Sequence, residues 1–445
     1  MPDAVTRWND VLLDVVRQVG GPPGPIGRGG AMMHGAIYDA VNSIVPTHEP
    51  YLIQVPAAPT ASIDAACAYA AHDTLAAAFP STTINLAKAL SDALKAIPSG
   101  TPAAEIAAGK AVGKAAALAM IQARTGDGAD VNLPYVAGSN PGDWRPTGSG
   151  PAASPNWPGV KPFCMTSGSQ FRPPRPAGYQ SKTQLLRSTE YAAQVNEVKR
   201  LGRVNSTDRN AEQTRIAFFW ANDADGTYKP PGQLFEITKT VSAQRGLDVV
   251  ENARLFALVA LAMGDAALVA WDAKYATDLD LWRPVTAIQL ADTDGNPATS
   301  KDATWQPLGT DPATGNPITP PFPAYISGHA TFGAAHAGVM RLYFGTDNVT
   351  FTATTEDPHP LAQGVTRSFN SFTEAARENA RSRIYLGVHF QFDGDHGFIS
   401  GTALAEFIMA TRLRPLGAVA PSVNGHRPRV VIKTPVKVAA DYVAE

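Results

Sequence analysis

Three short phrases in the second half of the chain combine residue types that bind a tetrahedral oxyanion. They are Trp282-Arg283-Pro284, Phe322-Pro-Ala-Tyr-Ile-Ser-Gly-His329 and Ser382-Arg383-Ile-Tyr-Leu-Gly-Val-His389. Each arginine offers a planar fork that can hydrogen-bond two oxygens, which lysine cannot do. A serine hydroxyl and a glycine amide at a helix amino terminus add directional donors, and two imidazoles add a nucleophile and a proton carrier. The sequence therefore predicts one oxyanion site made by Arg283, Ser327, Gly328, His329, Arg383 and His389.

The two imidazoles are expected to divide the chemistry. Asp393, four residues after His389, can accept a proton from one ring nitrogen and hold the other nitrogen toward the anion, as carboxylates do for metal-bound imidazoles. We therefore predict that His389 bonds the central atom of the oxyanion and that His329 is the acid or base. Arg383 and His389 are predicted to lie on one helix, where their six-residue spacing leaves them about 120° apart on its surface, flanking one pocket.

Helices are the elements that must position these residues. Apolar residues recur at helical spacing, whereas strand alternation is scarce, with residues 429–432 as the best candidate. Residues 132–178 and 292–320 are rich in Pro and Gly and are predicted as long crossovers. Helices are expected at about 30–44, 61–79, 83–96, 103–124, 180–204, 208–222, 232–245, 247–273, from the Ser-Gly-His phrase to 344, 371–388 and 394–413. The pattern predicts an all-α fold.

The 445 residues are expected to form a single helical body. Its predicted parts are amino-terminal helices and crossover at about 1–178, site-bearing helices at about 179–415, and a surface tail at 416–445. The net charge is -2, and Lys and Arg are scattered, so the chain has no basic field that would attract nucleic acid.

No membrane or export signal is evident in the sequence. The most apolar run, residues 255–270, is interrupted by Asp265 and is predicted to be a buried core helix. The amino terminus carries acids before any apolar run and lacks a cleavage motif, so a cytoplasmic or otherwise soluble location is expected. Cys67 and Cys164 could form one disulfide, but two buried free thiols are the preferred interpretation.

The sequence around these phrases resembles that of the vanadium-dependent haloperoxidases of the acid phosphatase superfamily. The likeness covers roughly residues 30 to 415, whereas soluble acid phosphatases of the superfamily are shorter and lack the amino-terminal half. Similar stretches include His34-Gly-Ala-Ile-Tyr-Asp-Ala-Val-Asn42, Gln170-Phe-Arg-Pro-Pro174, Ala217-Phe-Phe-Trp-Ala221, Trp271-Asp-Ala-Lys-Tyr275 and Ile384-Tyr-Leu-Gly-Val-His-Phe390.

The resemblance implies two four-helix bundles around a central vanadate site. The residue matching His389 is then the apical vanadium ligand, and those matching Lys274, Arg283, Ser327, Gly328 and Arg383 hold the vanadate oxygens. The residue matching His329 handles protons and the one matching Lys274 polarises hydrogen peroxide. A halide is oxidised to a hypohalous-acid equivalent that halogenates a small organic acceptor, with no haem or electron donor. Homodimers are also implied.

Two departures from the family pattern affect this interpretation. Nine residues separate Lys274 from Arg283 where the family has seven, so a two-residue loop or bulge between Tyr275 and Trp282 is needed for Lys274 to reach the site. Ile326 replaces the usual proline before Ser-Gly-His, which leaves the liganding atoms in place.

Several alternatives remain open at this point. The runner-up is a soluble acid phosphatase in which His389 forms a phosphohistidine, and a third hypothesis is a catalytically silent anion-binding protein. A zinc site using His336 and His396 lacks a compact ligand set. Aromatic Trp271 and Phe322 suggest oxidation of chloride and bromide but also fit ordinary core packing, and Asp223 is expected to pair with Arg283.

Overall fold

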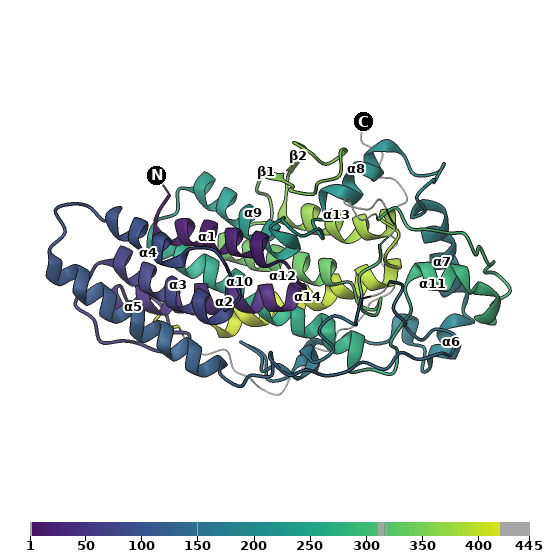
Figure 1. Cartoon of the computed structure of the whole chain (residues 1–445), viewed down its shortest axis with the longest axis horizontal. Helices are drawn as coiled ribbons and strands as arrows, with labels where there is room; N and C mark the ends of the chain where they lie inside the picture. The colour runs from purple at the N-terminus through teal and green to yellow at the C-terminus, as the bar shows by residue number, and fades with distance from the viewer. Residues whose placement is uncertain (1, 149, 310–315, 317, 419–445) are drawn as a thin grey trace.

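The computed structural model describes residues 2–148, 150–309, 316 and 318–418. Within these residues the chain forms fourteen α-helices and one two-stranded sheet, which confirms the predicted all-α class (Figure 1). The strand predicted at 429–432 and most of the predicted surface tail lie outside the described residues. The helices are α1 (Ala4–Val19), α2 (Pro23–Ile44), α3 (Ile63–Ala78), α4 (Leu86–Lys95), α5 (Ala103–Arg124), α6 (Lys182–Leu186), α7 (Thr189–Leu201), α8 (Ala211–Phe219), α9 (Lys229–Arg245), α10 (Val249–Tyr275), α11 (Pro284–Gln289), α12 (Gly328–Phe344), α13 (Phe372–Tyr385) and α14 (Gln391–Thr411).

Helix α10 connects two groups of helices. It packs against α2 on one side, where α2, α3 and α5 contact one another, and against α12 and α14 on the other, where α13 completes the group. Figure 1 shows α1 to α5 at one end of the molecule and α12 to α14 extending from its middle. The two bundles therefore share α10 as a common core element.

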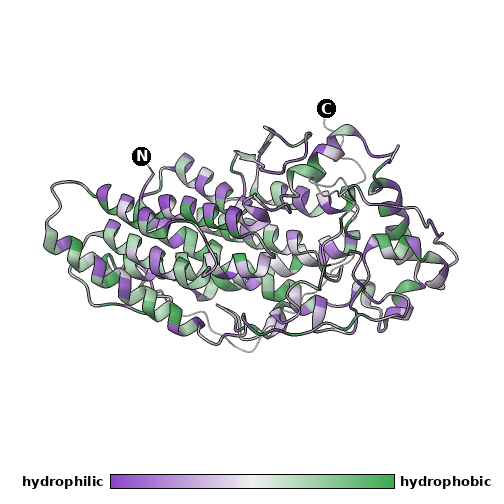
Figure 2. Ribbon diagram, in the orientation of Figure 1, coloured by the Kyte–Doolittle hydropathy of each residue, from purple (hydrophilic) through white to green (hydrophobic). Residues whose placement is uncertain are grey.

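Helix α10 is long and apolar enough to cross a membrane by length and composition alone. Its most apolar window is 94% buried inside the protein, as in the core helix of a globular fold. A capping box starts the helix, because the Asp248 side chain accepts from the amides of Val250 and Glu251 while Glu251 accepts from the amide of Asp248. Peripheral helices carry hydrophobic and hydrophilic residues together, as expected for helices with one buried face (Figure 2).

Helix α1 was not expected from the sequence, although its apolar residues follow helical spacing. Trp8, Leu12 and Val15 are buried, and Asp3 caps the amino terminus by accepting from the Thr6 amide at 2.9 Å. A second unexpected element is the hairpin of β1 (Phe351–Thr354) and β2 (Thr366–Phe369), whose strands are too short for a clear alternation signal. Helix α11 was also missed, since it has only six residues.

The long crossover between α5 and α6 is anchored to α10 by two carboxylates. Asp265 accepts backbone hydrogen bonds from residues 163, 164 and 165 at 2.7 to 2.9 Å, and Asp272 pairs with Arg172 through two bonds. Burial raises the pKa of the Asp265 carboxyl, although the three amides oppose this. Cys67 and Cys164 are free and buried, in agreement with the preferred interpretation.

Glycines allow α12 and α14 to approach closely next to the site. A Cβ atom on Gly397 would lie 2.8 Å from the Ser327 carbonyl oxygen, and one on Gly401 would lie 2.3 Å from that of Thr331. Such contacts are shorter than van der Waals distance, so both positions require glycine. This packing brings the first turn of α12 against the first turn of α14, where the Ser327 amide donates to the Asp393 carbonyl at 3.0 Å.

Candidate oxyanion site

The predicted site residues lie at the ends of five helices. Lys274 is in the last turn of α10, Arg283 caps α11, and Arg383 is in the last turn of α13. Ser327 to His329 begin α12, and His389 lies in the link between α13 and α14. Lys274, Arg283, Ser327, Arg383 and His389 are at most 2% exposed, so the chain brings three cationic side chains into its interior.

Hydrogen bonds fix the tautomer of His389. The Arg283 Nη1 atom, which can only donate, lies 3.0 Å from His389 Nε2, so Nε2 carries a lone pair. His389 Nδ1 then carries the proton and donates to Asp393 Oδ2 at 2.8 Å, as expected from the sequence. Burial, followed by the charges of Arg283 and Lys274, lowers the pKa of His389 well below its ordinary value. The ring is therefore neutral, and its Nε2 lone pair, which accepts from Arg283 in this structure, would bind an electrophilic centre in place of that hydrogen bond.

Arg283 ties together two segments of the site while keeping one nitrogen free. Its Nε atom donates to the Phe322 carbonyl and its Nη1 atom to the Val388 carbonyl, each at 2.8 Å. Its Nη2 atom is buried and has no hydrogen-bond partner among the described residues. An unpaired donor at this depth is costly unless a ligand satisfies it.

Arg383 presents two further unpaired donors. Its Nη2 atom donates to Asp223 Oδ2 at 2.8 Å, whereas Nε and Nη1 are buried and have no partner among the described residues. The Asp223 side chain is 36% exposed and that of Arg383 only 1%, so the pair lies where the site approaches solvent. Burial favours the neutral acid, but the charge and hydrogen bond of Arg383, together with His329 and Lys229, hold the pKa of Asp223 below its usual value.

These donors fit a tetrahedral oxyanion. Three unpaired guanidinium nitrogens from two arginines are hydrogen-bond donors, and the amide of Gly328 lies at the first position of α12, where it has no intrahelical acceptor. Ser327 caps this helix, with its oxygen accepting from the Ala330 amide at 3.4 Å, and its hydroxyl proton remains available to an anion. A Cβ on Gly328 would meet only Trp271, at 3.5 Å, so folding alone does not require glycine there.

Lys274 lies beside the other two cations. Its Nζ atom donates to the carbonyls of Pro323 and Ala324 at 2.6 and 3.0 Å, and both Lys274 and Arg283 lie 4.9 Å from the centre of the Phe322 ring. Burial and the charge of Arg283 lower the pKa of Lys274 well below its ordinary value. Helix α10 ends at Tyr275, so the two extra residues before Arg283 fall in a non-helical link at 276–281.

His329 is held by the carboxyl end of α8. Its Nε2 atom donates to the carbonyls of Trp220 at 3.1 Å and Ala221 at 3.3 Å, which leaves Nδ1 as the proton-accepting nitrogen of the neutral ring. Burial, with the nearby charge of Arg383, lowers the pKa of His329 to about 4. His329 is therefore neutral near pH 7 and suited to take a proton.

The structure corrects two expectations about neighbouring residues. Arg383 and His389 do not share a helix, because α13 ends at Tyr385 and Gly387, with φ of 82°, turns the chain toward α14. Asp223 forms its ion pair with Arg383 and not with Arg283. The peptide between Tyr325 and Ile326, where the family carries proline, is cis.

The zinc hypothesis receives no support from the described residues. His336 bonds Thr238 at 3.0 Å and His396 bonds Tyr325 at 2.6 Å, so the two imidazoles serve different contacts. No group of three His, Cys, Asp or Glu side chains in the described parts of the chain could hold a metal ion.

Sequence reasoning missed the partners that are backbone atoms. The carbonyls that bind Lys274 and His329 carry no side-chain signature, so no motif could have identified them. Trp271 and Phe322, expected as an aromatic wall, lie with ring centres 4.7 Å apart beside Lys274 and Gly328. This placement is compatible with ordinary core packing and also with an apolar wall that would desolvate a halide.

Comparisons with known proteins agree with this geometry. Residues 254–416 match the family described as the VCPO second helical-bundle domain. The vanadium chloroperoxidase of Curvularia inaequalis is 34% identical over 235 residues, which cover 43% of this chain and 37% of that relative. A bacterial vanadium-dependent iodoperoxidase structure has a TM-score of 0.75 at 24% identity, covering 93% of this chain and 96% of that one. A holo-type bacterial vanadium-dependent chloroperoxidase has a TM-score of 0.67 at 18% identity, covering 88% and 92%.

Proposed function

Because residues 254–416 carry the second helical-bundle domain of the vanadium chloroperoxidases, confirming the resemblance seen in the sequence, we propose that this chain is a vanadate-dependent haloperoxidase. It would oxidise halide with hydrogen peroxide to a hypohalous-acid equivalent that halogenates a small organic acceptor. The matched region spans 37% of the curated relative, so the activity is inferred for this chain from its own site.

One observation carries the proposal. Three buried guanidinium nitrogens have no partner among the described residues, and beside them lies a neutral imidazole whose Nδ1 proton is held by Asp393 and whose Nε2 lone pair faces Arg283. Buried donors of this kind indicate an anionic ligand, and an imidazole lone pair directed toward a cationic side chain of the site could instead bind an electrophilic central atom of that ligand. Vanadate satisfies both requirements.

The proposed roles follow from the positions of the side chains. His389 Nε2 would bind vanadium, and Lys274, Arg283, Ser327, Gly328 and Arg383 would hold the vanadate oxygens. Vanadate, when bound, would supply a Lewis-acidic centre that activates hydrogen peroxide toward a halide.

His329 and Lys274 would take part in the catalytic step. His329 Nδ1 would accept and return protons, because Nε2 is engaged with the carbonyls of α8. Lys274 would polarise the peroxide by donating a hydrogen bond from Nζ, and a bound vanadate anion would favour its charged form. The carbonyls of residues 323 and 324 hold its Nζ atom beside Arg283.

A phosphatase would use many of the same side chains, with His389 as the nucleophile and His329 as the acid. This alternative is not favoured, because the curated relative and the similar solved structures are all haloperoxidases.

We further propose that the whole chain acts as one soluble helical body and that it associates as a homodimer. The burial of α10, its most apolar helix, supports the soluble assignment.

The test uses purified full-length apoprotein with and without orthovanadate. Peroxide-dependent halogenation of a phenolic dye is measured with chloride, bromide and iodide, beside hydrolysis of nitrophenyl phosphate. Vanadate-dependent halogenation supports the proposal. Its absence with all three halides, at every vanadate concentration, would refute it, and phosphatase activity in that case would establish the alternative.

A further inference from the structure

The segment at the carboxyl end of α8 contacts two residues of the site. The carbonyls of Trp220 and Ala221 accept from His329, and Asp223 holds Arg383. Helix α8 has only nine residues, so its position depends on what anchors it from outside.

The anchors come from the β hairpin and from α13. Arg367 on β2 forms a two-bond ion pair with Glu378 on α13 at 2.7 and 2.6 Å, and its third nitrogen donates to Glu212 in the first turn of α8 at 2.7 Å. Glu378 also accepts from the indole nitrogen of Trp220 at 2.8 Å. Arg367 therefore contacts the start of α8 directly, at Glu212, and it reaches the end of α8 through Glu378, which bonds Trp220.

The connection between the hairpin strands adds a second anchor. Asn222, buried with φ of 44°, donates its amide to Asp357, and its side-chain oxygen accepts from Thr355 and Glu356. The loop that follows α8 is thus held at Asn222, which lies between Ala221, whose carbonyl contacts His329, and Asp223, which pairs with Arg383.

We propose that Arg367, acting through Glu378 and Trp220, is a positioning residue for His329. The side chains of Arg367 and Glu378 are 17% and 19% exposed, and each guanidinium nitrogen of Arg367 has a carboxylate partner, so this is a rigid pair in a partly desolvated setting. Its loss would free the end of α8 and loosen the two carbonyls that fix the imidazole. The structural role of Arg367 does not depend on the proposed function, whereas its expected effect on catalysis does.

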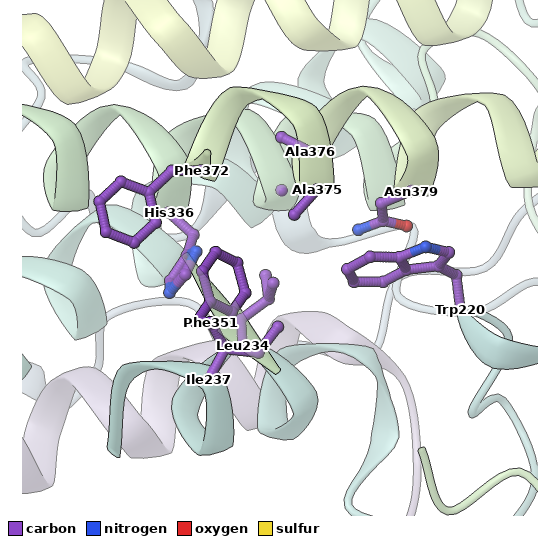
Figure 3. A pocket seen from close by; sticks show the side chains of 10 residues that line it. Trp220, Leu234, Ile237, His336, Phe351, Phe372, Ala375, Ala376 and Asn379 are labelled. Atoms are coloured by element: carbon purple, nitrogen blue, oxygen red, sulfur yellow. The ribbon is translucent and has the colours of Figure 1, made fainter. Parts of the chain in front are cut away.

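The choice of variants follows from the surroundings of Trp220. Its ring borders a small cavity of about 10 Å³ that His336, Phe351 and Asn379 also line (Figure 3). A smaller ring at 220 would enlarge this cavity and confuse packing with positioning. The test therefore changes the arginine, in the variants Arg367→Met and Arg367→Lys.

Arg341→Met is the matched control. Arg341 lies on α12, the helix that begins beside His329, and pairs with Glu406 at 3.5 Å without touching α8. The site lies about four turns away from it along α12.

Two measurements are made on the apoprotein. Hydrogen exchange follows the amides of residues 220–222, and nitrogen NMR follows the His329 ring, identified by comparison with His329→Gln. In Arg367→Met we expect faster exchange and a mixture of ring tautomers, and in Arg341→Met neither change. Unchanged exchange with a single tautomer in Arg367→Met would overturn the proposal.

Kinetics on the vanadate-loaded enzyme give the catalytic consequence. Arg367→Met should lower kcat roughly 10- to 100-fold while the Kd for vanadate changes less than about twofold, with Arg367→Lys between it and the wild type. A kcat within twofold of wild type, or an equal loss in Arg341→Met, would also overturn the proposal. A wild-type protein that does not halogenate refutes the proposed function, and the apoprotein measurements still decide the positioning role.

Discussion

Replacing Asp393 with asparagine should weaken vanadate binding about 10- to 100-fold and leave the protein folded. Among the residues proposed to hold the ligand, the Asp393 side chain hydrogen-bonds only the imidazole of His389 within the described part of the chain. It holds the Nδ1 proton at 2.8 Å and also accepts from the Phe390 amide at 3.0 Å, both through Oδ2. Its other oxygen is buried without a partner among the described residues.

The magnitude follows from these contacts. The asparagine oxygen can take the place of Oδ2, so both bonds survive as neutral ones, roughly half as strong as those to a carboxylate. That is a loss of about 1 kcal/mol for each bond, or about 2 kcal/mol in total. Since 1.4 kcal/mol is about a factor of ten in an equilibrium constant, the loss corresponds to roughly 30-fold if it falls on ligand binding.

The assay is titration of apoprotein with orthovanadate by calorimetry, with thermal unfolding measured in parallel. Asp395→Asn is the control, because this exposed carboxylate lies on the same helix and accepts from Gln391. The reasoning is wrong if Asp393→Asn binds vanadate within twofold of wild type, or if the control loses as much affinity.

Three further changes test other parts of the site and core. Lys274→Met should lower the halogenation rate roughly 100-fold in a steady-state assay, because a buried hydrogen-bond donor is lost next to the peroxide, and a rate within twofold of wild type contradicts this role. Gly328→Ala should have a free energy of unfolding within about 0.5 kcal/mol of wild type, since the new Cβ meets only Trp271 at 3.5 Å. The variant should nevertheless bind vanadate more weakly in calorimetry. Equal affinity would show that the anion does not approach this amide. Burial lowers the pKa of His336 to about 3, against 6.5 in the unfolded chain, so between these values the unfolded state binds the proton and acid destabilises the fold. From pH 7 to pH 5 the free energy of unfolding should fall by about 2 kcal/mol because of this group. In urea unfolding, His336→Gln should show a fall that is smaller than that of the wild type by this amount, and an equal fall in both proteins contradicts the burial argument.

The sequence predicted the elements whose signal comes from residues close together in the chain. Helical spacing located most of the long helices, and the Ser-Gly-His phrase located the start of α12 correctly. Asp393 was predicted as the partner of His389 because their four-residue spacing brings the two side chains together whether or not the helix includes both.

Contacts between distant segments could not be predicted in the same way. The partner of Asp223 was wrong because an ion pair depends on where a loop lies, and Arg383 is 160 residues away along the chain. The hairpin strands have four residues each, which is too short for alternation to distinguish them from a loop. The link after α13 was assigned to the helix because the turn depends on a single glycine, Gly387.

The burial of α10 on all sides has a consequence for directed evolution of this chain. A helix with one solvent face offers positions that accept almost any polar residue, but α10 is buried continuously from Leu255 to Lys274. Random substitutions there will mostly create cavities or clashes, so a mutant library that includes this helix will contain many misfolded clones. Libraries intended to alter the choice of halide or acceptor should therefore hold α10 constant.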